Sequence, residues 1–530
     1  MLRPLLIIMA TAFAVVLPFS FLGIPSGHDF EFHMNSWMEV LGQWKLAIIY
    51  PRWAALAHYG YGEPRFIFYP PASWTLGAIL GAILPWKLVP GTFVWLVLSL
   101  SGYSMFLLAR GWLARRDAIF AAALYVANPY HLVVVYWRSA FAELLGGALL
   151  PLLLFYVLRV ENGRQRVVLP ISLIVAAAWL TNIPCAVMVS YSLAFLMVMV
   201  AIGRRSPRIL WQGGLAVLLG GALSAFYILP VAYEKNWITI AQVLAPGVRP
   251  QDNFLFTLIN DPDHNRFNLL VSVIAEAEII VLAGAVFLSR RWRRSHTKVW
   301  WTLIGWAAAG TLLMFSFTFV AWQHLPELRY LQHPWRWLLC LNVALILLVT
   351  MAWRSWPLRL LVCVVMLAVL ALGWKHIQPP WWDTAADIAQ LQQSQQNTSG
   401  YEGTDEYTPA GADAYEIKLN ARRVTFEGAG TARIHVRQWA PETKMFTAEV
   451  SQPGRLILRL FNYPAWRVEV NGNAVLTKSQ EVTGQMIVPV EAGENRVLIT
   501  FTRTWDRTLG GIVSGATALF LVGLVALKPK

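Results

Sequence analysis

The chain has 530 residues, of which 57% are hydrophobic and only 14% are charged. Soluble domains carry about 25% charged residues, so this composition excludes an ordinary soluble protein and indicates a membrane protein. The net charge of +14 does not indicate a nucleic-acid-binding protein, because the basic residues form short clusters between apolar runs, as membrane topology requires.

Apolar runs near the length of a membrane-spanning helix recur along the chain. They predict an all-α polytopic membrane domain with 12 or 13 transmembrane segments. The first run is expected to remain as a helix and not to be removed as a signal peptide. The runs are Leu5–Leu22, Phe66–Leu84, Gly91–Ala109, Ala118–Tyr136, Ala140–Leu158, Val167–Leu180, Pro184–Ile202, Ile209–Val231, Leu269–Leu288, Trp300–Val320, Trp335–Met351, Pro357–Gly373 and Leu509–Leu527.

Basic clusters orient these segments, since short loops rich in Lys and Arg stay in the cytoplasm. One conflict arises: a crossing by Phe66–Leu84 would put the first cluster outside. Either that segment is re-entrant or strongly bent, or the cluster breaks the rule. The clusters are Arg110/Arg115/Arg116, Arg159/Arg164/Arg166, Arg204/Arg205/Arg208, Arg290/Arg291/Arg293/Arg294, Arg354/Arg359 and Lys528/Lys530.

The composition changes near residue 378, where a polar segment and short alternating runs replace the apolar runs. Alternation with a period of two predicts strands, and Asn471-Gly472 predicts a tight hairpin turn. We therefore expect a membrane domain over 1–377 with a large outer loop over 23–70, a small extracytoplasmic β-sandwich over 378–507, and a last transmembrane helix over 508–530. The expected strands are Tyr415–Leu419, Arg433–Trp439, Lys444–Val450, Arg455–Phe461, Trp466–Val470, Met486–Val490 and Arg496–Thr502.

The first outer loop opens with a dense group of titratable residues, His28, Asp29, Glu31 and His33. In an extended segment Asp29, Glu31 and His33 share one face; in a helix Asp29 pairs with His33 and His28 with Glu31. Either geometry suits a general base or a divalent cation, Mg²⁺ or Mn²⁺, held by these four residues. The alternative is an interfacial loop whose acids are simply hydrated.

Other charged residues fall on the same predicted side of the membrane. An arginine there can hold a lipid phosphate through two hydrogen bonds or extend toward lipid headgroups, and an acid beside it forms either a structural or a catalytic ion pair. The candidates for substrate or phosphate binding are Arg52, Arg65, Arg138, Glu143, Arg329 and Arg336.

Several short segments resemble known families. The arrangement of a first helix, an outer loop with an acid-x-acid motif, many helices and a soluble domain resembles the GT-C glycosyltransferase superfamily. The closer resemblance is to YfhO-like bacterial membrane proteins and to those labelled 6-pyruvoyl-tetrahydropterin-synthase-related. The matching segments are His28-Asp29-Phe30-Glu31, Tyr69-Pro70-Pro71, Arg138 to Glu143, Tyr463 to Val468, and Val490 to Asn495.

The resemblance implies a glycosyltransferase of the bacterial inner membrane, with its active face and β-domain outside the cytoplasm. It implies a polyprenyl-phosphate sugar donor, contact with membrane lipids, an acceptor that is an envelope glycan, lipid or protein, and no nucleic-acid partner. By resemblance Asp29 is the catalytic base or metal ligand, with Glu31 second. The rival functions are a flippase or transporter for lipid-linked sugars, and a non-catalytic envelope-assembly factor.

Overall fold

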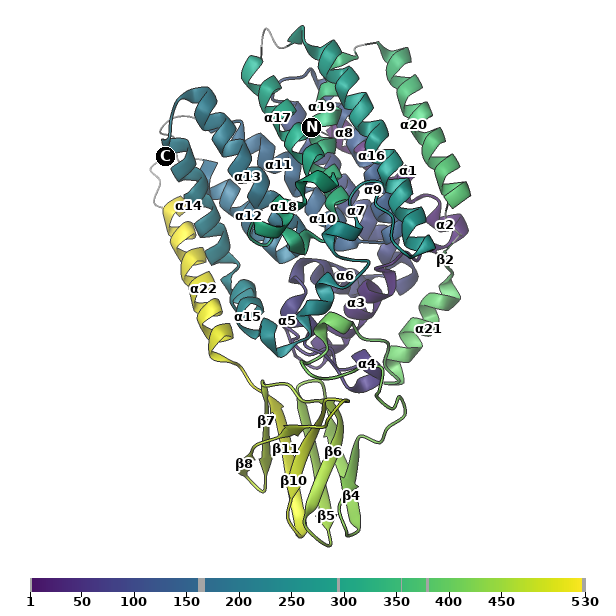
Figure 1. Ribbon diagram of the computed structural model, residues 1–530, viewed down its shortest axis with the longest axis vertical. Coiled ribbons are helices and arrows are strands. Elements are labelled where there is room, and N and C mark those ends of the chain that lie inside the picture. The colour runs from purple at the N-terminus through teal and green to yellow at the C-terminus, as the bar shows by residue number, and fades with distance from the viewer. Residues whose placement is uncertain (1, 161–166, 293–295, 354, 378–380, 527–530) are drawn as a thin grey trace.

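A computed structural model describes residues 2–160, 167–292, 296–353, 355–377 and 381–526 (Figure 1). Parts of the basic clusters, namely Arg164, Arg166, Arg293, Arg294, Arg354, Lys528 and Lys530, lie outside these residues. The α-helices of the bundle and its flanks are α1 (Leu2–Val16), α2 (Phe19–Leu22), α3 (Phe30–Lys45), α4 (Ala57–Gly60), α5 (Arg65–Phe68), α6 (Pro71–Ile83), α7 (Val89–Ala109), α8 (Arg115–Val126), α9 (Pro129–Val133), α10 (Phe141–Gly147), α11 (Leu149–Val157), α12 (Val168–Thr181), α13 (Ile183–Arg204), α14 (Arg208–Leu223), α15 (Ala225–Glu234), α16 (Pro262–Ser289), α17 (Thr297–Leu313), α18 (Phe319–His324), α19 (Leu338–Ala352), α20 (Trp356–Ile377), α21 (Ala385–Gln396) and α22 (Trp505–Ala526).

Within the described residues, seven helical stretches are long and apolar enough to cross a membrane, and two bent pairs raise the number to nine. The expected 12 or 13 segments are reached only when shorter apolar helices are counted as well. These shorter helices are Pro71–Ile83, Phe141–Val157, Val168–Thr181 and Trp356–Val365. The prediction of a polytopic helical membrane domain is confirmed, whereas many of its segments are shorter or more bent than the apolar runs indicated.

The direction of the first helices resolves the conflict over Phe66–Leu84. A Cβ atom at Gly102 would lie 2.6 Å from Ile8, and one at Gly91 would lie 3.4 Å from Phe19. Helices α1 and α7 are therefore antiparallel, and α7 begins at the end of the bundle where α1 finishes. The segment between them, which contains α6, starts and finishes at that same end. It does not carry the chain across, so the first arginine cluster, at the end of α7, lies at the end of the bundle where α1 begins.

The C-terminal strands form two antiparallel sheets that pack as a sandwich (Figure 1). One sheet has the order β3-β6-β10-β9 and the other β4-β5-β11-β7-β8. Buried side chains of both sheets make one apolar cluster, as expected for a sandwich. The strands are β3 (Val424–Glu427), β4 (Ala432–Trp439), β5 (Thr443–Val450), β6 (Gly454–Phe461), β7 (Trp466–Val470), β8 (Asn473–Val475), β9 (Lys478–Ser479), β10 (Gln485–Val490) and β11 (Gly493–Phe501).

Six of the seven expected strands are present, and Asn471 and Gly472 join β7 to β8 with positive φ angles of 52° and 83°. These angles suit the predicted two-residue turn. The expected strand over 415–419 is wrong, because that segment pairs with neither sheet. Its alternation reflects an irregular segment in which Ile417 packs into the sandwich core while Tyr415 stays exposed.

Two contacts hold the first loop at the end of the bundle where α1 and α20 finish. Strand β1 (Ile24–Pro25), just after α2, pairs with β2 (Trp382–Asp383), just after α20. Trp53 of the first loop packs against Trp466 of the sandwich, with ring centroids 5.3 Å apart. The first loop thus lies between the helices and the β-domain and contacts both.

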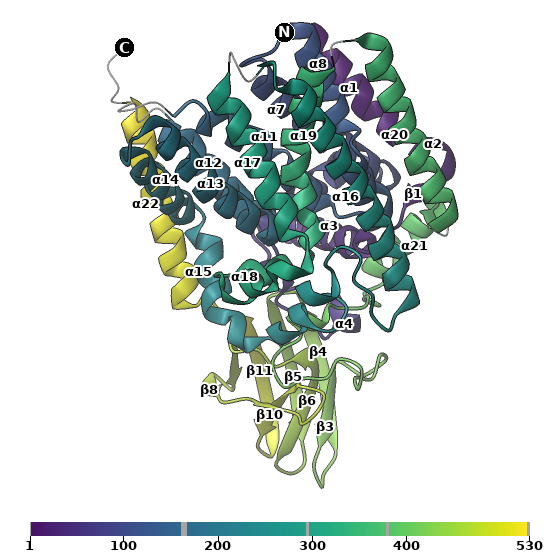
Figure 2. The same ribbon diagram turned by 45° about the horizontal axis from the view of Figure 1, so that its top comes forward.

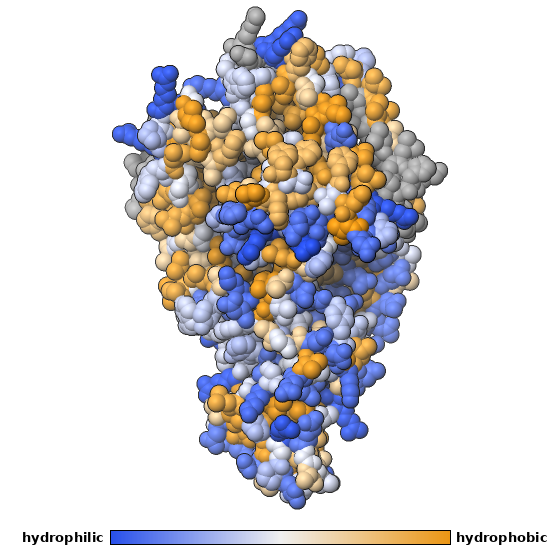
Figure 3. All heavy atoms as spheres, in the orientation of Figure 1, coloured by the Kyte–Doolittle hydropathy of each residue, from blue (hydrophilic) through white to orange (hydrophobic). Residues whose placement is uncertain are grey.

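A buried ion pair fixes the return of the chain from the sandwich into α22. Arg507 donates two hydrogen bonds of 2.7 Å to the carboxylate of Glu234 on α15, and Tyr463 donates one of 2.5 Å to the same carboxylate. Helix α22 then follows α15 and α14 back along the bundle in both views (Figure 2). Hydrophobic side chains gather over the upper helices, and hydrophilic ones predominate toward the β-domain (Figure 3).

Candidate active site

Asp29 lies directly before α3, at the end of the bundle that carries the β-domain. Gly27 makes this position possible, because a Cβ atom there would lie only 2.2 Å from the carbonyl oxygen of Trp137. The backbone N–H of Asp29 donates to the carbonyl oxygen of Arg138 over 2.9 Å, and the N–H of Gly27 donates to Ser139 Oγ over 3.0 Å. These contacts fix the first loop against the π-helical turn over Val134–Arg138.

The contact brings Asp29 to a buried network of charges from three separate parts of the chain. Arg138 Nη2 lies 3.7 Å from Asp29 Oδ2, and Arg138 Nη1 forms an ion pair with Glu143 Oε2. Arg336 Nε approaches the same Oε2 at 2.9 Å, while Tyr130 donates to Oε1 over 2.6 Å. Both carboxylate oxygens of Glu143 thus have partners, two arginines and a tyrosine. The network holds two positive charges, on Arg138 and Arg336, and the carboxylates of Glu143 and Asp29 balance them.

The two arginines differ in how their remaining N–H donors, those not bound to Glu143, are used. Arg336 Nη1 donates to the carbonyl oxygen of Leu331 over 2.6 Å and to Gln332 Oε1 over 3.2 Å. Arg138 Nη2 makes no hydrogen bond to any residue that the structure describes and points toward Asp29, whose side chain is 41% exposed. Arg138 is therefore the cation placed to receive an anionic group beside Asp29.

Two histidines border this network as neutral groups, His33 buried and His333 half-buried. His33, one turn after Asp29, is packed between Phe141 and Tyr69, and burial lowers its pKa to about 4. The ring of His333 stacks on Trp335 at 4.6 Å, and its burial, with the nearby Arg336, holds its pKa well below the ordinary value. Both imidazoles are thus uncharged near pH 7.

The predicted metal ligands do not converge. Glu31 is exposed in the first turn of α3, and its pKa is raised by partial burial and by the neighbouring carboxylates of Asp383 and Glu402. The ring of His28 packs against Phe267, with centroids 5.3 Å apart. Among the described residues, no three His, Cys, Asp or Glu side chains are grouped to hold a metal ion. The residues present therefore do not fit a protein-held cation.

Arg65, predicted to bind phosphate, lies in a different cluster. Its Nε donates to Glu63 over 2.5 Å, Nη1 to Ser36 over 3.1 Å and Nη2 to Thr404 over 3.2 Å. Glu63 also pairs with His58, and these contacts lower the pKa of Glu63 to about 2, against the opposing effect of burial. This buried group holds the first loop to the segment before the sandwich.

Arg52 and Arg329 also lie away from Asp29. Arg52 packs over the ring of Tyr50 at 4.8 Å and lies near Arg507, which together with burial lowers its pKa. Arg329 is exposed beside Tyr330. Of the six predicted substrate residues, the structure brings Arg138, Glu143 and Arg336 together with Asp29.

Tyr130, His333 and Trp335 complete the network, although the sequence did not predict any of them as a site residue. All three lie in polar stretches on the predicted outer side, next to Arg138 or Arg336 in the sequence or in space. The ring of Trp335 lies 5.0 Å from the guanidinium carbon of Arg138. An aromatic residue beside an arginine was the available signal, and it was too common in this chain to identify them.

Comparisons with known proteins give a family and remote structural likenesses. The family model described as 6-pyruvoyl-tetrahydropterin synthase related domain, membrane protein, matches residues 66–378. A cryo-EM structure of the arabinofuranosyltransferase AftD from Mycobacteria is similar at a TM-score of 0.40 and 18% identity, over 71% of this chain and 26% of that one. A mutant of AftD gives 0.41 and 17%, over 70% and 27%. The chain thus spans about a quarter of these enzymes. No curated protein matches.

Proposed function

The chain belongs to the family of membrane proteins described as 6-pyruvoyl-tetrahydropterin synthase related, and from this premise we propose that it is a GT-C-type membrane glycosyltransferase. The match confirms the family resemblance and contains two of the short segments, Tyr69-Pro70-Pro71 and Arg138 to Glu143. The proposed donor is a polyprenyl-phosphate-linked sugar, and the proposed acceptor is an envelope glycan, lipid or protein.

The observation that carries the proposal is the pairing of a partly exposed acid with an arginine that retains free donors. Asp29 Oδ2 and Arg138 Nη2 lie 3.7 Å apart. A lipid-linked sugar phosphate needs a cation near the membrane surface, and its transfer needs a base for the acceptor hydroxyl. Asp29 can serve as the base and Arg138 as the cation, and the two side chains are neighbours.

In the proposed reaction Asp29 accepts the proton of the acceptor hydroxyl as its oxygen forms a bond to the anomeric carbon. The bond from that carbon to the phosphate oxygen breaks, and the electron pair leaves with polyprenyl phosphate. Arg138 stabilises the growing charge on the departing phosphate, because it is held in place by Glu143 and costs no reorganisation. A divalent cation bound with the substrate would add Lewis-acid stabilisation, and no step here depends on one.

We place the site on the outer face of the bacterial inner membrane. Once α6 is taken as re-entrant, the described arginine clusters share the end of the bundle opposite Asp29 and the β-domain, which the positive-inside rule assigns to the cytoplasm. A topology reporter at Gly428 of the β-domain should report an extracytoplasmic position, and one at Gly111 a cytoplasmic position. The reverse pattern would contradict this orientation.

The direct test is transfer of radiolabelled sugar from a polyprenyl-phosphate donor by vesicles containing the purified full chain. Lipid-linked-glycan profiles of a deletion strain would identify which donor to use. Movement of the donor between leaflets without transfer would instead indicate a flippase. Absence of both, with retained envelope assembly by an Asp29→Asn variant, would indicate a non-catalytic assembly factor.

A further inference from the structure

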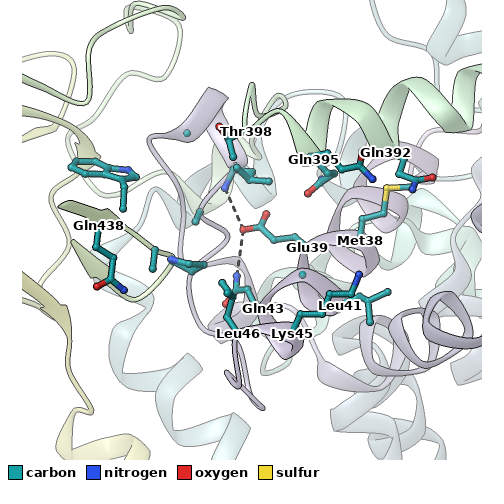
Figure 4. Close-up of a pocket in the computed structure, with 18 of the residues that line it drawn as sticks. Met38, Glu39, Leu41, Gln43, Lys45, Leu46, Gln392, Gln395, Thr398 and Gln438 are labelled. Carbon is teal, nitrogen blue, oxygen red and sulfur yellow. Dashed lines mark hydrogen bonds between the residues drawn. The ribbon is translucent and has the colours of Figure 1, made fainter. Parts of the chain in front are cut away.

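A pocket of about 630 Å³ lies between α3, α21 and the β-domain, away from the Asp29 network. Its walls carry an unusual number of side-chain amides. Gln43 comes from α3, Gln392 and Gln395 from α21, and Gln438 from β4 (Figure 4). An amide group both donates and accepts hydrogen bonds, which suits the hydroxyl groups of a sugar.

Contacts within the protein hold two of these amides through their nitrogens. Gln43 donates from Nε2 to the carbonyl oxygen of Trp53 over 2.8 Å, and its buried Oε1 has no hydrogen-bond partner. Gln395 donates from Nε2 to Asn35 Oδ1 over 3.1 Å. Trp86 and Trp439 add aromatic surface to the same pocket, and such surface packs well on the apolar face of a sugar ring.

The β-domain contributes two neighbouring arginines to the pocket, Arg423 and Arg459. The backbone N–H of Arg459 donates to the carbonyl oxygen of Arg423 over 2.9 Å, so the two residues are adjacent. Neither forms an ion pair with an acid in the described part of the chain. Arg459 Nε is buried without a hydrogen-bond partner, and burial together with Arg423 lowers the pKa of Arg459.

Arg423 is exposed and Arg459 is half-buried, so the pair places positive charge without a protein carboxylate at the edge of the pocket, where an anion from outside can bind. The pocket therefore combines hydroxyl-binding amides, aromatic surface and an uncompensated positive charge. A neutral sugar would leave the arginines unpaired, and an acidic peptide would make poor use of the glutamines. A sugar chain with a carboxylate or phosphate group satisfies all three features.

Helix α3 connects this pocket to the proposed active site. Asp29 precedes the helix, and Glu39 and Gln43, farther along it, line the pocket. At 1.5 Å per residue, Glu39 lies about 15 Å along the helix from Asp29. An acceptor held in the pocket would have to span about this distance to reach Asp29.

We propose that this pocket is an acceptor subsite that binds an oligosaccharide carrying a carboxylate or phosphate group. The inference rests on the proposed glycosyltransferase function and adds the class of its acceptor. The arginine pair would bind the anionic group, and the glutamines of α3 and α21 would bind the ring hydroxyls.

The test uses the full chain in lipid nanodiscs, labelled with a fluorophore and applied to an array of bacterial oligosaccharides. The array carries uronate- or phosphate-bearing glycans, their neutral counterparts and acidic peptides. Arg423→Gln and Gln392→Ala should weaken binding of the acidic glycans, the former about tenfold or more because a charged hydrogen bond is lost. The matched controls are Arg433→Gln on β4 and Gln393→Ala on α21, both exposed and outside the pocket.

Acidic glycans that bind no better than neutral ones, or a preference for acidic peptides, would overturn the proposal. Equal binding by Arg423→Gln and its control would do so as well. The Asp29→Asn variant should bind the array like the unmodified protein while losing transfer. If the unmodified protein binds acidic glycans without transferring any sugar, the proposed catalysis fails and the binding subsite stands.

Discussion

Replacing Asp29 with Asn separates catalysis from folding, because the change keeps the shape of the side chain and removes its charge. The carboxylate lies 3.7 Å from Arg138 and is 41% exposed. At that distance, two charges surrounded mostly by water interact by about 1 kcal/mol, and exposed pairs typically contribute less. We expect the unfolding temperature to change by no more than about 4 °C.

The effect on transfer should be far larger. A positioned base contributes about 10²–10⁴ to the rate, so the initial rate of sugar transfer should fall at least about 100-fold in vesicles containing equal amounts of protein. Asp263→Asn is the matched control, since Asp263 Oδ1 also lies 3.7 Å from an arginine nitrogen, on Arg266, but is 93% exposed. Transfer by Asp29→Asn at the rate of that control would refute the assignment of the base.

Four further changes test the surrounding structure. Glu31→Gln should reduce transfer less than the Asp29 change, because its carboxylate faces other acids and not Arg138; kcat and KM would show it. Glu143→Gln should lower stability by about 3–5 kcal/mol, since it leaves buried arginines unpaired; thermal unfolding would measure this. Burial raises the pKa of Glu39 from 4.5 to about 7. The stability that the protonated side chain contributes is therefore fully present below pH 4.5, and about 3 kcal/mol of it is lost as the pH rises through 7. The unfolding temperature of the Glu39→Gln variant should lack this pH dependence. Glu234→Gln should loosen the β-domain, which faster hydrogen exchange at its base would reveal.

The fold was largely predictable because its two signals are strong and local. Long apolar runs identify membrane helices, and alternation with a period of two identified most strands of the sandwich. The failures have physical causes. The apolar run over 66–84 was long enough to span, but Pro70, Pro71 and Pro85 restrict the helix to Pro71–Ile83. Only the packing of α1 against α7 shows that this segment returns to the end where it began.

The candidate site was predictable in part. The density of acids and histidines located Asp29, and the cost of charges next to apolar runs located Arg138, Glu143 and Arg336. The spacing of residues in the sequence could not show that Arg65 forms an ion pair with Glu63, or that Arg52 lies near Arg507 and Glu442 beside the sandwich. The first pair joins residues only two positions apart, whose side chains need not meet, and the second contact joins segments hundreds of residues apart. Spacing in the sequence predicts neither.

The acid-x-acid motif illustrates how local geometry divides two residues that look equivalent in sequence. Because α3 begins at Phe30, Asp29 and Glu31 are two positions apart at a helix start and face different neighbours, about 200° apart around the axis. Asp29 meets Arg138 through a loop that only Gly27 permits, whereas Glu31 meets Asp383 and Glu402. Partial burial and these two acids raise the pKa of Glu31, whereas Asp29 lies beside the arginine that would hold an anionic substrate. The close approach at Gly27, more than the motif itself, therefore places Asp29 and not Glu31 beside Arg138.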